Sequence, residues 1–231
     1  MRLALEPAGA ERAQPVAAAR AAWAAGLDGV LLTACDALPA PLVTAAYVAA
    51  TVPDLLVAAE VELGDRHPLE VAEEALTADQ ATGGRLVVVA RPAAGAEDAY
   101  DEALELVRTA AVARPFAFAG ERWRVPARLA ENTDAHDELV RVMPPPARAR
   151  LELWRAGDLP RVRHGDPAAT VAALRAGRAE HGWEWAALTA PVAAAAELGA
   201  RVRPRVQLDR LPDGLERHWE QTLDSEQRSE R

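Results

Sequence analysis

Residues 67–92 read HPLEVAEEALTADQATGGRLVVVARP, and this stretch decides the fold class. Pro68 suits the first turn of a helix, and Gly83 with Gly84 is typical of the turn that ends one. Residues 85–90, RLVVVA, are almost entirely apolar, as strands covered on both faces are. A helix that passes through a tight turn into such a strand predicts a parallel α/β fold.

The same alternation fills the first 113 residues. Strands are predicted over 2–6, 28–34, 54–63 and 85–90, and helices over 14–26, 39–51, 68–84 and 96–113. Four successive strand–helix units with short links predict a parallel barrel, although an open doubly wound sheet begins in the same way.

The pattern breaks at residues 114–150, which hold a predicted hairpin around Ala119 and Gly120, a polar acidic stretch and a proline triplet. Beyond this excursion, strands are predicted over 151–157, 183–190 and 201–209, and helices over 166–182, 192–199 and 212–231. Seven strands are one fewer than a closed barrel needs, and such barrels take about 250 residues. We expect one domain over residues 1–231, α/β and TIM-barrel-like, incomplete or shortened in its second half, with a frayed tail at 222–231.

Composition excludes several classes of protein. The formal net charge of −9 argues against non-specific binding to nucleic acid. No run of about 18 apolar residues occurs, which predicts no membrane span, and the N-terminus turns charged too early for a signal peptide. The scattered histidines show no metal-ligand spacing. Motifs of P-loop kinases, Rossmann dehydrogenases, serine hydrolases and zincins are absent. We expect a cytoplasmic protein without a metal.

Five segments in order carry a resemblance to a known family. They are AAGLDGVLLT (24–33), ATVPDLLVAAEVEL (50–63), HPLEVAEEALTADQATGGR (67–85), RLVVVARP (85–92) and FAFAGERWRVPARL (116–129). Together they resemble the luciferase-like flavin-dependent monooxygenases, the superfamily of bacterial luciferase and the F420-dependent oxidoreductases. The resemblance covers roughly residues 1 to 130 of the 231.

The resemblance implies a barrel that binds FMN or F420 at the carboxyl ends of its strands, with a small-molecule substrate. It implies a non-prolyl cis peptide between Ala58 and Ala59 against the flavin ring, although an ordinary strand explains the same residues. Arg91 would contact the flavin phosphate, or else pair with Glu60 or Glu62. His67, which opens a helix, would lie on the substrate side as a catalytic residue, or bond a loop carbonyl.

The family's phosphate-binding hydroxyl run is missing, because no Ser or Thr occurs between Leu151 and Gly165. Arginines at strand ends must then hold any flavin phosphate, and Arg91 and Arg155 are the candidates. Further polar residues at strand ends predict a substrate pocket built from Glu6, Thr33, Cys35, Asp36 and Glu60. Strand alternation puts Glu60 and Glu62 on the same side, and Cys35 has the alternative of being a small core residue.

Two functions follow from the resemblance. The first is a flavin-dependent (FMN or F420) oxidoreductase or monooxygenase. The alternative is a non-catalytic relative that serves as a partner subunit or binds a ligand, and the missing hydroxyl run favours it. Relatives pair through their second and third helices, so we expect a homodimer, or a heterodimer with a homologue, through residues 40–51 and 70–81.

Overall fold

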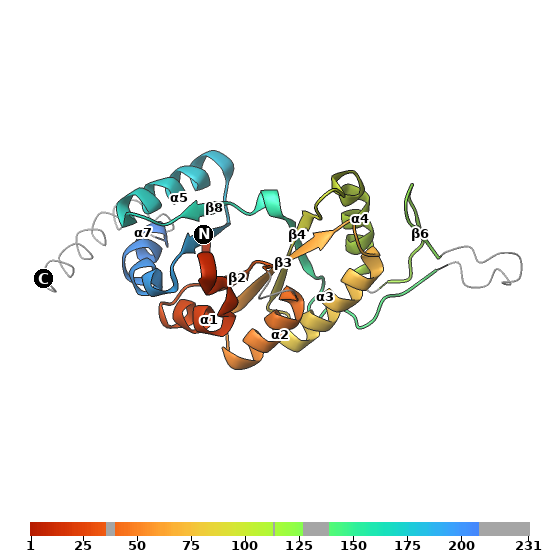
Figure 1. Cartoon of the computed structure of the whole chain (residues 1–231), viewed down its shortest axis with the longest axis horizontal. Coiled ribbons are helices and arrows are strands. Elements are labelled where there is room, and N and C mark those ends of the chain that lie inside the picture. Colours follow the sequence, from red (N-terminus) through yellow and green to blue (C-terminus); the bar gives the residue numbers. More distant parts are fainter. Residues whose placement is uncertain (36–39, 113, 127–138, 208–231) are drawn as a thin grey trace, which may run out of the picture.

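The computed structural model describes residues 1–35, 40–112, 114–126 and 139–207, and its centre is a curled sheet of parallel strands (Figure 1). The strand order is β7-β4-β3-β2-β1-β9-β8, and every pairing in it is parallel. The strands are β1 (Arg2–Pro7), β2 (Gly29–Leu32), β3 (Leu56–Leu63), β4 (Leu86–Pro92), β7 (Glu152–Arg155), β8 (Arg161–Arg163) and β9 (Trp185–Ala190). The predicted α/β fold, TIM-barrel-like and incomplete, is confirmed.

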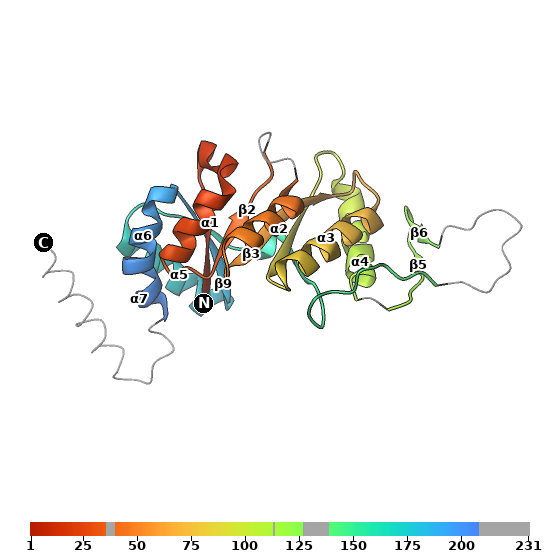
Figure 2. The same ribbon diagram turned by 90° about the horizontal axis from the view of Figure 1, so that it is seen from below.

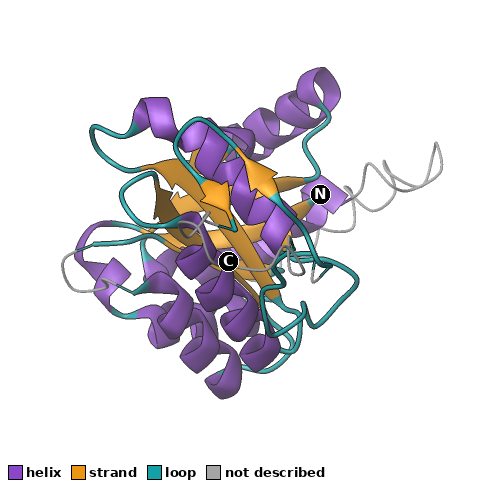
Figure 3. Ribbon diagram, turned by 90° about the vertical axis from the view of Figure 1, so that its right-hand side faces the viewer, coloured by secondary structure: helices purple, strands orange, loops and turns teal. Residues whose placement is uncertain are grey.

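Helices cover the outer face of the sheet, and Figure 3 shows the strands inside their curved layer. The longer ones are α1 (Pro15–Ala24), α2 (Pro41–Thr51), α3 (Pro68–Thr82), α4 (Glu97–Ala110) and α5 (Pro167–His181). Short helical turns complete the described chain: η1 (Gly9–Ala13), η2 (Ala156–Asp158), η3 (Val192–Ala194), α6 (Ala195–Glu197), the π-helical η4 (Leu198–Val202) and α7 (Arg203–Gln207). Proline opens α1, α2, α3 and α5, where its missing N–H costs no hydrogen bond.

Two apolar clusters lie on the two faces of the sheet. The larger one fills the space between the strands and the helices. The smaller one lies inside the curl and includes Ala4, Leu31, Ala58 and Ala187, so these strands are buried on both faces. This explains why the strands read as continuous apolar runs in the sequence.

The Gly-Gly-Arg sequence at the end of α3 has a structural role. Gly83 adopts the left-handed conformation (φ 64°) that ends the helix. Arg85 then donates to the carbonyl oxygens of Thr82 (2.9 Å) and Ala49 (2.9 Å), and more weakly to that of Val52 (3.3 Å). One guanidinium thereby satisfies carbonyls at the ends of α2 and α3 and fixes both helices ahead of β4.

The curl stops short of a closed barrel. Strands β7 and β8 follow each other in the chain but lie at opposite edges of the sheet. They are linked by the short turn η2 instead of a crossover helix. The gap between these edge strands is called the seam below, and Figure 1 shows α4 and α5 on either side of it.

The parallel sheet of the described residues has the predicted seven strands, but one of the seven was predicted in the wrong place. Residues 201–209 were expected to form a strand, whereas 203–207 form α7 after the π-helical turn η4. Val202 and Val206 are four residues apart and both fully buried, which suits one face of a helix. The strand that replaces it is β8, whose three residues are too few to show a pattern. The helix predicted over 212–231, with the tail at 222–231, lies outside the described residues.

The excursion between α4 and β7 contains the predicted hairpin, formed by β5 (Phe118–Ala119) and β6 (Arg124–Val125). Figure 2 shows it beyond α4, away from the sheet. Glu102 of α4 anchors it by accepting the backbone N–H groups of Arg122 (3.0 Å) and Trp123 (3.0 Å).

The segment that returns from the excursion is fastened to the end of α3. Asp79 accepts the backbone N–H of Ala147 at 2.7 Å, and Gln80 donates to the carbonyl of Pro145 at 2.6 Å. Asp79 is 3% exposed, and this burial raises the pKa of its carboxyl group although the Ala147 hydrogen bond opposes the rise.

We therefore predict that Asp79→Asn changes the pH dependence of stability. A carboxyl with a raised pKa keeps its proton in the folded state after the unfolded chain has lost its own, so its contribution to stability falls as pH rises. Asparagine keeps an acceptor for Ala147 and does not titrate. In urea unfolding from pH 4 to pH 7, the free energy of unfolding of the variant should rise relative to that of the wild type as pH rises. A difference that is constant with pH would contradict this.

Candidate functional site

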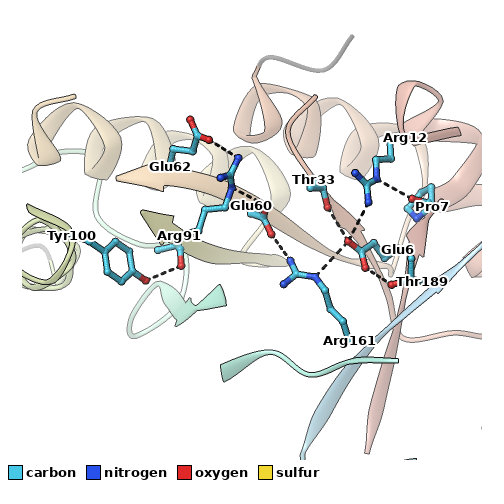
Figure 4. Close-up of polar contacts among 11 residues, drawn as sticks. Glu6, Pro7, Arg12, Thr33, Glu60, Glu62, Arg91, Tyr100, Arg161 and Thr189 are labelled. Atoms are coloured by element: carbon cyan, nitrogen blue, oxygen red, sulfur yellow. Dashed lines mark hydrogen bonds and ion pairs between the residues drawn. The ribbon is translucent and has the colours of Figure 1, made fainter. Parts of the chain in front are cut away.

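Glu6 lies at the carboxyl end of β1 and is 3% exposed. It accepts hydrogen bonds from two threonine hydroxyl groups at the ends of the neighbouring strands. Thr33 follows β2 and donates to Oε1 at 3.2 Å, and Thr189 of β9 donates to Oε2 at 2.6 Å. Figure 4 shows these side chains converging inside the curl. Because both carboxylate oxygens accept hydrogen bonds, the Glu6 side chain is held in one position.

Arg161 of β8 joins this carboxylate to a second one. Its Nε lies 3.4 Å from Glu6 Oε1, and its terminal nitrogen donates to Glu60 of β3 (Figure 4). Glu60 is 5% exposed, so it too needs a cation nearby. Arg161 therefore bridges carboxylates from two strands that are not adjacent in the sheet.

Arg91 of β4 extends the network on the other side of Glu60. Its Nε lies 3.0 Å from Glu60 Oε1 as an ion pair that lacks the angle of a hydrogen bond, and its terminal nitrogen pairs with Glu62. Both glutamates face the same side of β3, as predicted. At the far end, Arg12 lies 4.0 Å from Glu6. Three arginines and three glutamates thus form the charge-balanced group that we call the carboxyl-end network.

The structure brings together part of the predicted site. Glu6, Thr33, Glu60 and Arg91 lie in the carboxyl-end network. Cys35 is a free thiol that packs against the larger apolar cluster between sheet and helices, as its alternative interpretation held. Asp36 lies outside the described residues.

The side chains of the two alanines that were predicted to contact a flavin point to opposite faces of the sheet. Ala58 faces the interior of the curl and Ala59 faces the helices. The cis peptide bonds of the described residues both precede proline, so the Ala58–Ala59 bond is trans. The cis bond that the resemblance implied is not present, and the alternative of an ordinary strand is what the structure has. Both alanines pair regularly with β2 and β4, and nothing there holds a costly conformation.

His67 and Arg155 have structural contacts. His67 is exposed at the start of α3, where its Nδ1 accepts the backbone N–H of Leu69 at 3.2 Å. Arg155 points outward from β7 to α4, where it pairs with Asp101 at 2.6 Å, and this partner raises the pKa of its guanidinium. It also lies 5.5 Å above the ring of Tyr100, whose pKa is raised by burial. Arg155 therefore stands on the face of the sheet opposite to Arg91.

Sequence reasoning missed Arg12, Arg161 and Thr189. Arg161 sits in the strand that was not predicted, and Arg12 follows β1 in η1. A usable signal existed for Thr189, because it lies at the end of a predicted strand as Thr33 does. The described residues contain no group of three or more potential metal ligands, and no described helix is long and apolar enough to cross a membrane.

No family model matches the sequence, and no curated protein sequence matches it. Solved structures do match. The monooxygenase RslO1 from Streptomyces bottropensis is 19% identical with a TM-score of 0.52, over 77% of this chain and 58% of that one. The oxygenating constituent of 3,6-diketocamphane monooxygenase from the CAM plasmid of Pseudomonas putida, in complex with FMN, is 16% identical with a TM-score of 0.53, over 92% and 64%.

A third match is riboflavin lyase with modified FMN and riboflavin, 15% identical with a TM-score of 0.53, over 78% of this chain and 58% of that one. The chain thus spans 58 to 64% of the length of these proteins. The expected likeness to luciferase-like monooxygenases is therefore found at the level of the fold.

We predict that Arg161→Met destabilises the fold by about 2–3 kcal/mol, below the cost of breaking a fully buried pair because the arginine is partly exposed. The variant keeps the length of the side chain and removes the charge that Glu6 and Glu60 share. Adding Glu60→Gln should recover part of the loss in a double-mutant cycle of urea unfolding. Arg163→Met, on the same strand, is the matched control, and equal small losses from both arginines would contradict the prediction.

Proposed function

We propose that the chain binds a flavin phosphate, FMN or F420, at the carboxyl ends of β3 and β4 and acts as a luciferase-like oxidoreductase on a small molecule. The fold shared with two monooxygenases, one of them in complex with FMN, and with riboflavin lyase supports this class. Ligands of parallel barrels lie at the carboxyl ends of the strands. The single observation that carries the proposal is the position of Arg91 at that end of β4, with its side chain 35% exposed.

Arg91 fits a phosphate because one of its two partners is replaceable. Glu62 is 40% exposed, so water can solvate it when it leaves the arginine. Glu60 is buried and also contacts Arg161, so it keeps its counter-charge and continues to orient Arg91. A phosphate would take the place of Glu62 and form charge-assisted hydrogen bonds with the terminal nitrogens.

The remaining network would define the floor of the site. Glu6, held by Thr33 and Thr189, presents its carboxyl group to Arg161. When bound, a reduced flavin would supply hydride transfer or reaction with oxygen. The chain's own residues would bind and orient the substrate, and Glu6, Thr33 and Glu60 are the described residues proposed for that pocket. His67, as a helix cap, is proposed to shape the rim of the site.

The second candidate function is a non-catalytic relative that partners a homologue or binds another ligand. This second function is favoured by the ion pairs that Arg91 already forms with both Glu60 and Glu62. The absence of Ser or Thr between Leu151 and Gly165 adds to this, and so does the outward direction of Arg155. In that case the carboxyl-end network serves only to hold the strands together.

Titration with FMN and riboflavin separates the two functions. Arg91→Ala should weaken FMN binding about ten- to a hundredfold, since a charge-assisted contact contributes about 1.5–3 kcal/mol, and should hardly change riboflavin binding. Glu62→Gln should strengthen FMN binding by removing the competing carboxylate. Arg122→Ala, an exposed arginine paired with Asp98, is the control. Equal weak binding of FMN and riboflavin, unchanged in Arg91→Ala, would favour the non-catalytic relative.

We also propose that the chain dimerises through α2 and α3. Val43 and Tyr47 of α2 are 69% and 63% exposed, and a groove of about 590 Å³ runs between the two helices. The two faces are not uniformly apolar, because α3 exposes Glu73 and Glu74. Exposed apolar side chains beside a groove are a common feature of interfaces.

Sedimentation velocity at micromolar concentration tests the dimer. The wild type should sediment as a dimer, and the double variant Val43→Glu with Tyr47→Glu should sediment as the 24.6 kDa monomer. The reason is that the added charges would be buried at the interface. Trp23→Glu, which changes an exposed apolar residue on α1, is the control. A wild-type monomer, or a dimer unaffected by the double substitution, would count against this surface.

A further inference from the structure

A large cavity opens at the end of the sheet opposite to the carboxyl-end network. It measures about 1180 Å³ and lies where β1, β7 and β9 begin and where α4 and α5 end. Its wall includes the first residues of the sheet, Arg2 and Trp185 among them, and the ends of the two helices beside the seam. The size lies slightly above the range of about 300–1,000 Å³ that is typical of small-molecule sites. Neither the fold likeness nor the proposed flavin site assigns a role to this place.

The charge of the cavity wall is opposite to that of the protein. The chain carries a net charge of −9, yet five arginines line this one cavity against two glutamates. The arginines are Arg2, Arg108, Arg148, Arg150 and Arg178, and the glutamates are Glu152 and Glu184. Arg2, Arg108 and Arg150 form no ion pair with a described residue, whereas the charge of Arg148 acts on the buried carboxylate of Asp79. Elsewhere, the arginines of the carboxyl-end network are each balanced by a carboxylate.

The other component of the wall is aromatic. Trp154 and Trp185 meet edge to face with ring centroids 5.5 Å apart, and Arg2 lies 5.2 Å above the ring of Trp185. Trp183 lies so close to Gly177 of α5 that a Cβ there would fall 2.1 Å from the ring. The glycine therefore allows the indole to lie flat against the helix, where it is partly exposed to the cavity.

We propose that this cavity binds a soluble aromatic phosphate, that is, a nucleotide-type ligand with a flat ring and phosphate groups. Arginines without carboxylate partners supply the charge-assisted donors that phosphates need, and indole rings supply stacking surfaces for a flat base. A compact cavity in an otherwise acidic protein suits a small ligand better than a nucleic acid, whose backbone needs an extended basic surface.

The seam explains why a site exists at this end. A second, smaller cavity of about 280 Å³ shares Trp154, Trp183, Trp185 and Arg108 with the first and continues to Asp158 and Pro160. These last two residues belong to the link between β7 and β8, where a complete barrel would carry a helix. The missing helix thus leaves room beside the tryptophans, into which a ring can enter from the arginine side.

Calorimetric titration of the full chain with ATP, adenosine and inorganic tripolyphosphate tests the proposal, with tryptophan fluorescence as a second readout. ATP should bind at least tenfold more tightly than either of the others, because only ATP has both the ring and the phosphates. Comparable binding of ATP and tripolyphosphate means an adventitious anion only, and no binding at millimolar ATP overturns the site. Tighter binding of a single-stranded oligonucleotide than of ATP overturns the small-ligand assignment.

Variants locate the ligand. Arg108→Ala and Arg150→Ala should each weaken ATP about tenfold and leave adenosine nearly unchanged. Trp183→Leu should weaken both ligands, whereas Trp183→Phe, which keeps a ring on Gly177, should retain most of the binding. Arg20→Ala, an exposed arginine on α1 outside the cavity, is the matched control. Equal losses from Arg20→Ala and the cavity arginines would overturn the site.

FMN is itself an aromatic phosphate and could bind at either end of the sheet, so the variants must show which of the two proposed sites holds it. Loss of FMN binding in Arg91→Ala alone supports the proposed flavin site and leaves the ATP result to decide this inference. Loss in Arg108→Ala and Arg150→Ala, with Arg91→Ala unchanged, supports the cavity and argues against the flavin site. The two proposals can therefore fail independently.

Discussion

The carboxylates of Glu6 and Glu60 are almost completely buried, and their need for a cation constrains the shape of the whole sheet. Arg161 meets that need from β8, four strands away from β3 in the sheet order. In a flat sheet four strand spacings amount to roughly 19 Å, far beyond the reach of one side chain. Contact with both glutamates therefore requires the sheet to curl, so the ion pairs and the apolar interior of the curl support the same geometry.

The same ion pairs explain why the sheet curls without closing between β7 and β8. Arg161 ties the carboxyl end of β8 to β1 and β3, while β7 is held by β4 and, through Arg155, by Asp101 of α4. No pairing of described residues joins β7 to β8. The curl is thus fixed on both sides of the seam without being closed across it, and Trp154 and Trp185 occupy the interior there. Large rings fill space that a closed barrel would fill with another layer of side chains.

The sequence predicted the fold wherever a local pattern had a local cause. Pro68, Gly83 and the apolar run of β4 each act on their own residues, so the βα units could be placed within a few positions. The site depended on partners far apart in the chain. Glu60 was predicted as a pocket residue or as a partner of Arg91, but its other partner, Arg161, is 101 residues away on a strand of three residues. Only the strand order, set by burial on both faces, brings them together.

The two ends of the sheet use arginine in opposite ways. At the carboxyl end each arginine is matched by a glutamate, so a phosphate can enter only by displacing a partner, and Glu62 is the one partner exposed enough to leave. At the amino end Arg108 and Arg150 form no ion pair with any carboxylate of the described residues. A new anion gains more where charge is uncompensated than where it must compete, because the competing carboxylate has to be solvated again. The seam, which places tryptophans beside those arginines, therefore makes the amino end the more receptive one for an anionic ring.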